Sequence, residues 1–116
     1  MGQYAPTYMT NLDGYDEDTD VLKAPVNRVL PYIVGIARVG QVLSVNTGVW
    51  TARPAAAFTY QWKRGGVNIA GATNQTYVPV SPADDAVDLT CAVTGTNSQG
   101  NSMATTASLN IPDSTP

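Results

Sequence analysis

The sequence contains no histidine and a single cysteine, Cys91, among its 116 residues. These shortages exclude an intrachain disulfide, a zinc site built from histidine and cysteine, and a nucleophile–histidine catalytic pair. Paired carboxylates could still act as acid and base, but Asp84 and Asp85 follow Pro82 just before a predicted strand, where Asp commonly caps a turn. We therefore predict no metal ion, no cofactor and no enzymatic activity.

Charged residues are also scarce, at 13% of the chain against a usual share of roughly 25%. The formal net charge is -3 and the sequence pI is about 4.4, without the clustered basic surface that nucleic-acid binding requires. No apolar run approaches the roughly 20 residues of a membrane span, and the first residues lack the pattern of a secretory signal. We expect neither a nucleic-acid partner nor a membrane partner.

The few charges are unevenly distributed. Residues 13–20 carry five acids and no base, whereas residues 21–116 carry six bases and four acids. Within the acidic run, Asp16, Asp18 and Asp20 have the spacing of the first ligands of a calcium loop. However, Val21 stands where that loop needs glycine and Asn27 where it needs a bidentate glutamate. The pattern therefore predicts an acidic segment that faces solvent or a partner, attached to a mildly basic body.

Residues 1–31 show no sustained hydrophobic period and are predicted to form an extended N-terminal arm. Aromatic side chains in such a segment have no core of their own, so they are best used as anchors in grooves of another subunit. We expect the acidic side chains beside them to add orientation and a faster association rate. The predicted partner-binding residues of the arm are Tyr4, Tyr8, Leu12, Tyr15, Asp16, Glu17 and Asp18.

From residue 32 the pattern changes to short apolar or alternating segments separated by turn residues, which is typical of an all-β sandwich or barrel. Phe58, Tyr60 and Trp62 alternate with polar residues and are predicted to lie on the inner face of a strand. Residues 103–111 are expected to form one last long strand after a hairpin loop at residues 97–100. The other predicted strands begin at Ile33 or cover residues 42–47, 67–69, 76–80 and 87–94.

Several of these segments carry a family resemblance, which covers about two thirds of the chain. They are Val39-Gly40-Gln41-Val42-Leu43, Gly48-Val49-Trp50, Tyr60-Gln61-Trp62-Lys63-Arg64, Ile69-Ala70-Gly71-Ala72-Thr73, Thr76-Tyr77, Leu89-Thr90-Cys91-Ala92-Val93 and Asn97-Ser98-Gln99-Gly100. In this order, they resemble an immunoglobulin-like domain of the kind found in bacterial surface proteins and tailed-bacteriophage virion proteins. The resemblance implies an immunoglobulin-like β-sandwich over residues 32–111. Pro112 ends the last predicted strand, and residues 112–116 are expected to form a polar tail.

The resemblance also implies roles for single core residues. Trp62 corresponds to the tryptophan packed between the two sheets, and Cys91 to the cysteine of the sixth strand. Val45 or its neighbour Leu43 stands at the position of the partner cysteine, so aliphatic packing replaces the disulfide. Leu89 stands where many members have tyrosine. These departures favour a protein that folds in a reducing bacterial cytoplasm.

The combination of an acidic arm with such a domain resembles a tailed-phage capsid decoration protein. This resemblance implies a non-enzymatic protein on the capsid exterior, bound to the major capsid protein or another virion protein. Two alternatives remain: a tail or neck accessory protein, and an adhesion module for bacterial surface glycans that uses residues 97–101 or an exposed contact formed by Trp50 and Arg53. The edge strands at residues 67–69 and 76–80 are candidates for contacts between copies.

Overall fold

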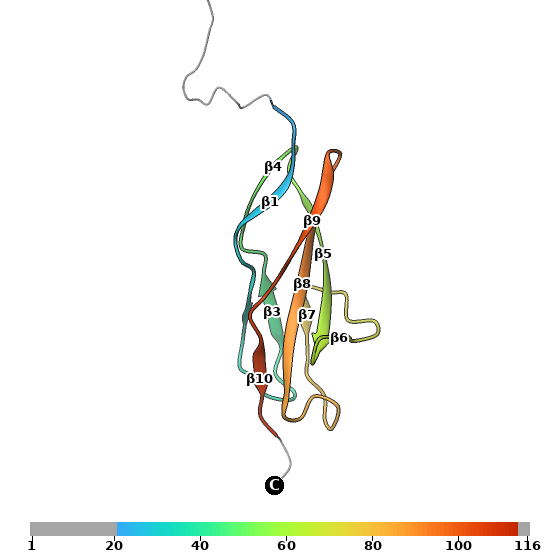
Figure 1. Ribbon diagram of the computed structural model, residues 1–116. Helices are drawn as coiled ribbons and strands as arrows, with labels where there is room; N and C mark the ends of the chain where they lie inside the picture. Colours follow the sequence, from blue (N-terminus) through green and yellow to red (C-terminus); the bar gives the residue numbers. More distant parts are fainter. Residues whose placement is uncertain (1–20, 114–116) are drawn as a thin grey trace, which may run out of the picture.

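The structure is a computed structural model that describes residues 21–113 (Figure 1). Over this range it contains β-strands and no helix, which confirms the predicted all-β class. The strands are β1 (Lys23–Val29), β2 (Tyr32–Val34), β3 (Leu43–Asn46), β4 (Val49–Arg53), β5 (Ala57–Arg64), β6 (Val67–Asn68), β7 (Thr76–Tyr77), β8 (Val87–Asn97), β9 (Gly100–Thr105) and β10 (Leu109–Ile111).

The strands form three antiparallel sheets. A three-stranded sheet has the order β2-β3-β7, and a five-stranded sheet has the order β10-β8-β5-β6 with β9 also paired to β8. Strands β1 and β4 form a separate two-stranded ribbon at one end of the body (Figure 1). Side chains from both larger sheets meet in one core, which makes the fold β-sandwich-like. The fully buried core residues are Leu43, Val45, Trp62, Leu89, Cys91, Val93 and Ile111.

The centre of the core is the pairing of β5 with β8. Trp62 lies directly opposite Cys91 in the register, and neither side chain is exposed to solvent. Phe58 and Tyr60 are half-buried against the same core, as their alternation with polar residues predicts. The indole Nε1 of Trp62 donates a 2.9 Å hydrogen bond to the carbonyl oxygen of Asn74, so the largest buried side chain leaves no unpaired donor.

The turn from β5 to β6 follows from its sequence. Gly65 and Gly66 have φ of 55° and 84°, the left-handed conformation that a two-residue hairpin loop of this kind requires at both central positions. The two edge strands predicted at residues 67–69 and 76–80 are present but shorter, because β6 ends at Asn68 and β7 ends at Tyr77.

The single long strand predicted for residues 103–111 is wrong. It is divided into β9 and β10, and the register shows why: Ala92 pairs with Thr105 but Leu89 pairs with Leu109, so three steps along β8 match four on the other side. One extra residue is therefore inserted, as in a β-bulge. The insertion reverses the buried side, because Ala104 is buried before it and Ile111 after it, while Met103 is 61% exposed.

Strand pairing begins before the predicted start of the sandwich at residue 32. Strand β1 pairs with β4, and its register is irregular between Lys23 and Val26, where Pro25 cannot donate a ladder hydrogen bond. The side chain of Ser102 donates to the carbonyl oxygen of Pro25 at 2.8 Å. The last part of the predicted arm, up to residue 31, is thus hydrogen-bonded to the folded body.

Candidate interaction surface

The β1–β4 ribbon presents one exposed face that combines positive charge with valine. Lys23 lies opposite Arg53, and Val26 lies opposite Thr51. Arg28 belongs to the same face because its Nε donates to Thr51 Oγ1 at 3.2 Å. All five side chains are exposed. We call these residues (Lys23, Val26, Arg28, Thr51 and Arg53) the ribbon face.

The charge of the ribbon face contrasts with that of the opposite end of the body. The four acids among residues 21–113 are Asp84, Asp85, Asp88 and Asp113. They lie at or near the start of β8, whose first residue Val87 pairs with Ile111 of β10 close to the C-terminus (Figure 1). Lys63 and Arg64 lie at the same end as these acids, opposite Thr90 and Leu89 in the register, so that end carries both signs of charge while the ribbon face carries cations alone.

Trp50 lies on the other side of the ribbon and is half-buried. Its ring makes an edge-to-face contact with Phe58, with a centroid distance of 5.5 Å, and its Nε1 donates to the carbonyl oxygen of Thr47 at 2.6 Å. A Cβ atom added at Gly95 would lie 3.3 Å from the Trp50 ring, so this glycine leaves room for the indole. Trp50 therefore closes the ribbon end of the core, while Arg53 is exposed on the ribbon face.

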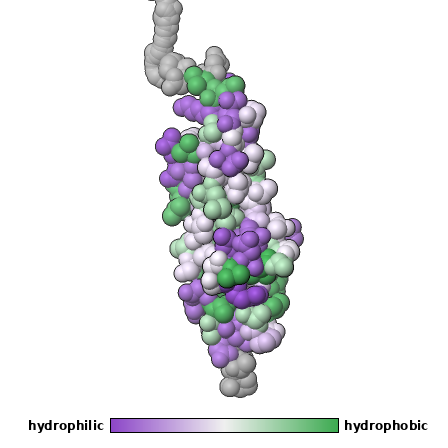
Figure 2. All heavy atoms as spheres, turned by 45° about the vertical axis from the view of Figure 1, so that its right-hand side comes forward, coloured by the Kyte–Doolittle hydropathy of each residue, from purple (hydrophilic) through white to green (hydrophobic). Residues whose placement is uncertain are grey.

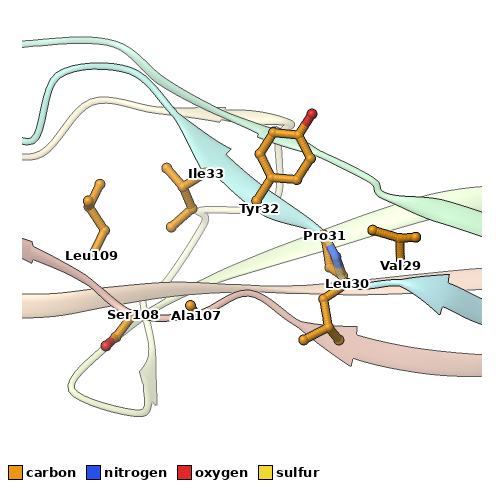
Figure 3. Close-up of a pocket in the computed structure, with 8 residues that line it drawn as sticks. All are labelled: Val29, Leu30, Pro31, Tyr32, Ile33, Ala107, Ser108 and Leu109. Carbon is orange, nitrogen blue, oxygen red and sulfur yellow. The ribbon is translucent and has the colours of Figure 1, made fainter.

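An apolar groove begins where the ribbon ends. It has a volume of about 360 Å³ and is bounded by the link between β1 and β2 on one side and the link between β9 and β10 on the other (Figure 3). The hydroxyl of Tyr32 points away from Ala107 and Ser108, so the hollow itself is predominantly apolar (Figure 3). We call this the edge groove; its lining residues are Val29, Leu30, Pro31, Tyr32, Ile33, Ala107, Ser108 and Leu109.

The edge groove lies beside one outer strand of each larger sheet, β2 and β10. Within residues 21–113, β2 pairs only with β3, and β10 pairs only with β8. The outer edges of β2 and β10 are therefore open at the two sides of the groove, and an open edge is a ready template for a further extended segment. The groove thus offers apolar contacts beside unpaired strand edges.

Besides Ser102, Asn97 connects the ribbon to the rest of the body. Asn97 Nδ2 donates to the carbonyl oxygen of Lys23 at 2.7 Å and to that of Pro54 at 2.8 Å. These bonds connect the start of β1, the turn after β4 and the β8–β9 hairpin. Residues that precede Lys23 therefore leave the body from a defined point.

A buried polar cluster lies at the opposite end, around Asp84. This carboxylate is fully buried and accepts hydrogen bonds from Arg64 Nε and the Tyr77 hydroxyl, both at 2.5 Å, and from Val80 N at 2.9 Å. Burial acts to raise the pKa of Asp84, but the hydrogen bonds from these donors outweigh it and hold the pKa below its ordinary value. The donors of Arg64, Tyr77 and Val80 are all directed at the Asp84 carboxylate, so we assign the cluster a structural role in the fold.

Cys91 is not a reactive thiol. Its side chain has no exposed surface, and burial raises its pKa to about 11. A thiol of this kind stays protonated and is a poor nucleophile or metal ligand at neutral pH. Cys91 thus lies in the core together with the other residues that the resemblance assigned there, Val45, Trp62 and Leu89.

The arm residues expected to bind a partner fall outside the described part of the chain: Tyr4, Tyr8, Leu12, Tyr15, Asp16, Glu17 and Asp18. Sequence reasoning missed the edge groove. The sequence signal for it was the short apolar run that Pro25 and Pro31 bracket. Two members of that run, Val29 and Leu30, line the groove and are more than half exposed in the structure. Figure 2 shows exposed apolar atoms at the end where the described chain begins and, separately, along the body.

Residues 21–113 contain no group of three or more Asp, Glu or Cys side chains placed to hold a metal ion. No helix long and apolar enough to cross a membrane occurs in the same range. No family model matches the sequence, and searches of curated proteins and of solved structures found no similar chain.

Proposed function

We propose that this chain is a non-enzymatic virion structural protein of a tailed bacteriophage. In this proposal it is a capsid decoration protein that binds the major capsid protein through its N-terminal segment and displays an immunoglobulin-like domain outward. The two antiparallel sheets that share a core, with Trp62 of β5 packed opposite Cys91 of β8, support the immunoglobulin-like assignment. The proposed location is the exterior of the capsid.

The observation that carries the proposal is the position of the two ends of the folded body. The described chain enters at the ribbon end and leaves beyond β10 at the other end (Figure 1). A body held by the segment before its first strand would therefore project its far end away from the surface that it binds. Because residues 23–29 are hydrogen-bonded to β4, the proposal assigns the partner contact to the residues before Lys23.

The composition of that segment supports binding to a protein surface. It offers tyrosines without a core of their own and five acids between residues 13 and 20. Tyrosine anchors supply contact area, and an acidic run is attracted to a basic patch on a capsid subunit. If a partner binds this segment, the hydrogen bonds that Asn97 and Ser102 donate to β1 would keep the whole body attached to that partner.

Co-sedimentation with phage capsids, full and empty, at two salt concentrations tests the proposal. We expect the full chain to sediment with capsids, more weakly at high salt, and a variant lacking residues 1–20 to stay in the supernatant. Circular dichroism and thermal melting must show that the shortened variant is folded. Binding that persists without residues 1–20 would contradict the assignment of the arm.

A matched pair of charge variants separates the acidic arm from net charge. Asp16→Asn, Glu17→Gln and Asp18→Asn together should weaken capsid binding. The control, Asp85→Asn, Asp88→Asn and Asp113→Asn, removes the same charge from the other end of the body and should bind like the original chain. If neither the chain nor its variants bind any capsid, the tail or neck alternative takes precedence, and labelled microscopy of whole virions would test it.

The glycan-binding alternative offered two loops, one at residues 97–101 and one in which Trp50 is an exposed platform on which a sugar could stack. The ring instead packs on Phe58 and covers Gly95. The form of this alternative that uses Trp50 therefore lacks physical support, and the form that uses residues 97–101 stays an alternative to the capsid proposal.

A further inference from the structure

A small hollow lies on the outer face of the five-stranded sheet. It has a volume of about 170 Å³ and is lined by residues of β5, β6, β8 and β9. Cys91 and Val93 fill the core, so Ala92 between them faces outward, where it lies opposite Gln61 on one side and Thr105 on the other. Because alanine has the smallest side chain of this row, the face of the sheet is hollowed at this position.

The walls of the hollow belong to regular strands. Every lining residue lies in a strand, and Nε2 of Gln61 donates to the carbonyl oxygens of Trp62 at 2.8 Å and Ile69 at 2.9 Å. These bonds fix one wall against the loop that follows β6. A site built on strands is already ordered, so a ligand would lose little binding free energy in ordering it.

Four polar side chains with free hydrogen-bonding capacity line the hollow. Thr59 lies directly opposite Thr94 at one end, and Lys63 lies directly opposite Asn68 at the other. Among residues 21–113, no hydrogen bond or ion pair engages these four side chains. Threonine and asparagine can both donate and accept, whereas lysine only donates and carries a positive charge. One end therefore offers two hydroxyls, and the other offers a cation and an amide.

An apolar contact completes the lining. Met103 lies directly opposite Thr94, and its side chain is 61% exposed. Together with the methyl group of Ala92, it offers apolar surface to the C–H groups of a ligand. No Asp or Glu lines the hollow, so the charge of Lys63 has no counterion within it.

These groups define the chemistry of a matching ligand. Ligand hydroxyls would match the threonines and the asparagine, a carboxylate would match Lys63, and C–H groups would match Met103. An amino acid fits poorly, because no acid lines the hollow to pair with its ammonium group. Inorganic phosphate fits poorly, because it has no C–H groups. The volume lies below the roughly 300–1,000 Å³ of pockets for drug-sized ligands, so the hollow suits a single ring.

We propose that this hollow binds one uronic acid unit, with its carboxylate on Lys63 and its hydroxyls hydrogen-bonded to Thr59, Thr94 and Asn68. Four residue steps, about 13 Å, separate Lys63 from Thr59 along β5, and the flexible lysine stem covers part of that span. One sugar ring with its carboxylate then bridges the two ends. The hollow shares no residue with the edge groove or the ribbon face, and the inference does not depend on the capsid proposal, which concerns the residues before Lys23.

Titration of the isotope-labelled full chain tests the inference by nuclear magnetic resonance at constant ionic strength. Sodium D-galacturonate or sodium D-glucuronate should shift the amide signals of Thr59, Lys63, Asn68 and Thr94 in a saturable way and leave that of Leu30 unchanged. D-galactose lacks the carboxylate and sodium acetate lacks the hydroxyls, so each should bind about tenfold more weakly or worse. Absence of saturable shifts with both uronates, or equal binding of acetate, would overturn the proposal.

Two pairs of variants test the assigned contacts. Lys63→Gln should weaken galacturonate binding about tenfold or more, whereas Arg38→Gln, which removes an exposed cation elsewhere, should not change it. Thr94→Val should weaken binding several-fold, whereas Thr96→Val, on the same face of β8 but outside the lining, should not. Thermal melting must show that all four variants are folded. Unchanged affinity in Lys63→Gln and Thr94→Val, or equal losses in their controls, would overturn the assignment.

A longer probe identifies the source of the unit. Trigalacturonate that shifts the same amide signals at lower concentration than galacturonate would indicate one unit of an acidic polysaccharide. Binding of galacturonate without binding of the trimer would indicate the free sugar acid. Trimer binding that shifts other signals only, with no response at Lys63 and Thr94, would overturn the proposed site.

Discussion

Arg64 Nε lies 2.5 Å from Oδ1 of Asp84, a carboxylate with no exposed surface. This ion pair joins the last residue of β5 to the turn before β8. The other carboxylate oxygen accepts from Tyr77 of β7, so one aspartate connects a strand of each larger sheet. The far end of the sandwich is therefore held together by a polar cluster whose members are all paired.

Loss of the Asp84 carboxylate is expected to destabilise the fold strongly. Asp84→Ala leaves the donors of Arg64, Tyr77 and Val80 without their acceptor, and breaking such a buried pair costs about 3–5 kcal/mol. Asp85→Ala is the matched control, because its carboxylate accepts from Ser81 Oγ at an exposed position, and we expect it to cost less than about 1 kcal/mol. Urea unfolding of both variants measures the difference, and equal costs would contradict the structural role of Asp84.

The same carboxylate should make the stability depend on acidity. Because the pKa of Asp84 in the folded chain lies below its ordinary value of 3.8, the unfolded chain takes up the proton first as the pH falls. The stability that Asp84 contributes is thus fully present above about pH 5 and is lost as the pH falls through the folded-state pKa. Unfolding midpoints measured between neutral and strongly acidic pH should fall more steeply for the original chain than for Asp84→Asn. Parallel profiles would show that other carboxylates control the acid response.

The buried thiol of Cys91 predicts the opposite response at alkaline pH. Burial raises its pKa from 9.0 to about 11, so the unfolded chain loses this proton first as the pH rises. Stability should therefore decline between these two values, by at most about 3 kcal/mol from this group. Cys91→Ala should show a shallower alkaline decline. In the native chain at neutral pH, the thiol should not react with iodoacetamide until a denaturant is added; rapid native labelling would contradict the burial.

Gly48 is expected to be the glycine least tolerant of replacement at the ribbon. It has φ of 78°, and an added Cβ would lie 2.1 Å from the carbonyl oxygen of Val29. Gly48→Ala combines left-handed strain with a backbone clash and should cost more than about 3 kcal/mol. Gly40→Ala has a similar φ of 86° with open space around it, so it should show only the strain, about 1 kcal/mol. Thermal melting of the two variants compares them, and similar melting temperatures would contradict the close approach of Gly48 to the end of β1.

Local sequence patterns were sufficient to predict the all-β fold class and much of the core. The alternation of Phe58, Tyr60 and Trp62 predicts a strand with one buried face, and β5 has that face toward the core. Adjacent glycines at 65 and 66 predict the tight turn that follows. These features were predictable because a two-residue period and a left-handed turn are properties of a few neighbouring residues.

Two features could not be obtained in this way. The bulge between β9 and β10 depends on pairing with β8, and nothing in residues 103–111 alone shows that the buried side changes between Ala104 and Ile111. The sequence offered Trp50 as part of an exposed contact, whereas its half-buried ring packs against Phe58 at the end of the core. Both depend on partners distant in the sequence.

The sequence by itself determined the all-β class, the inner face of β5, and the separation of an acidic segment from a mildly basic body, since composition and short-range periodicity are sufficient for each. Only the tertiary structure decided that residues 23–29 pair with β4, that Lys23, Arg28 and Arg53 share one face, and that an apolar groove lies between open strand edges. The physical reason is that sheet pairing and register are set by contacts between distant segments, and these contacts determine which side chains become neighbours.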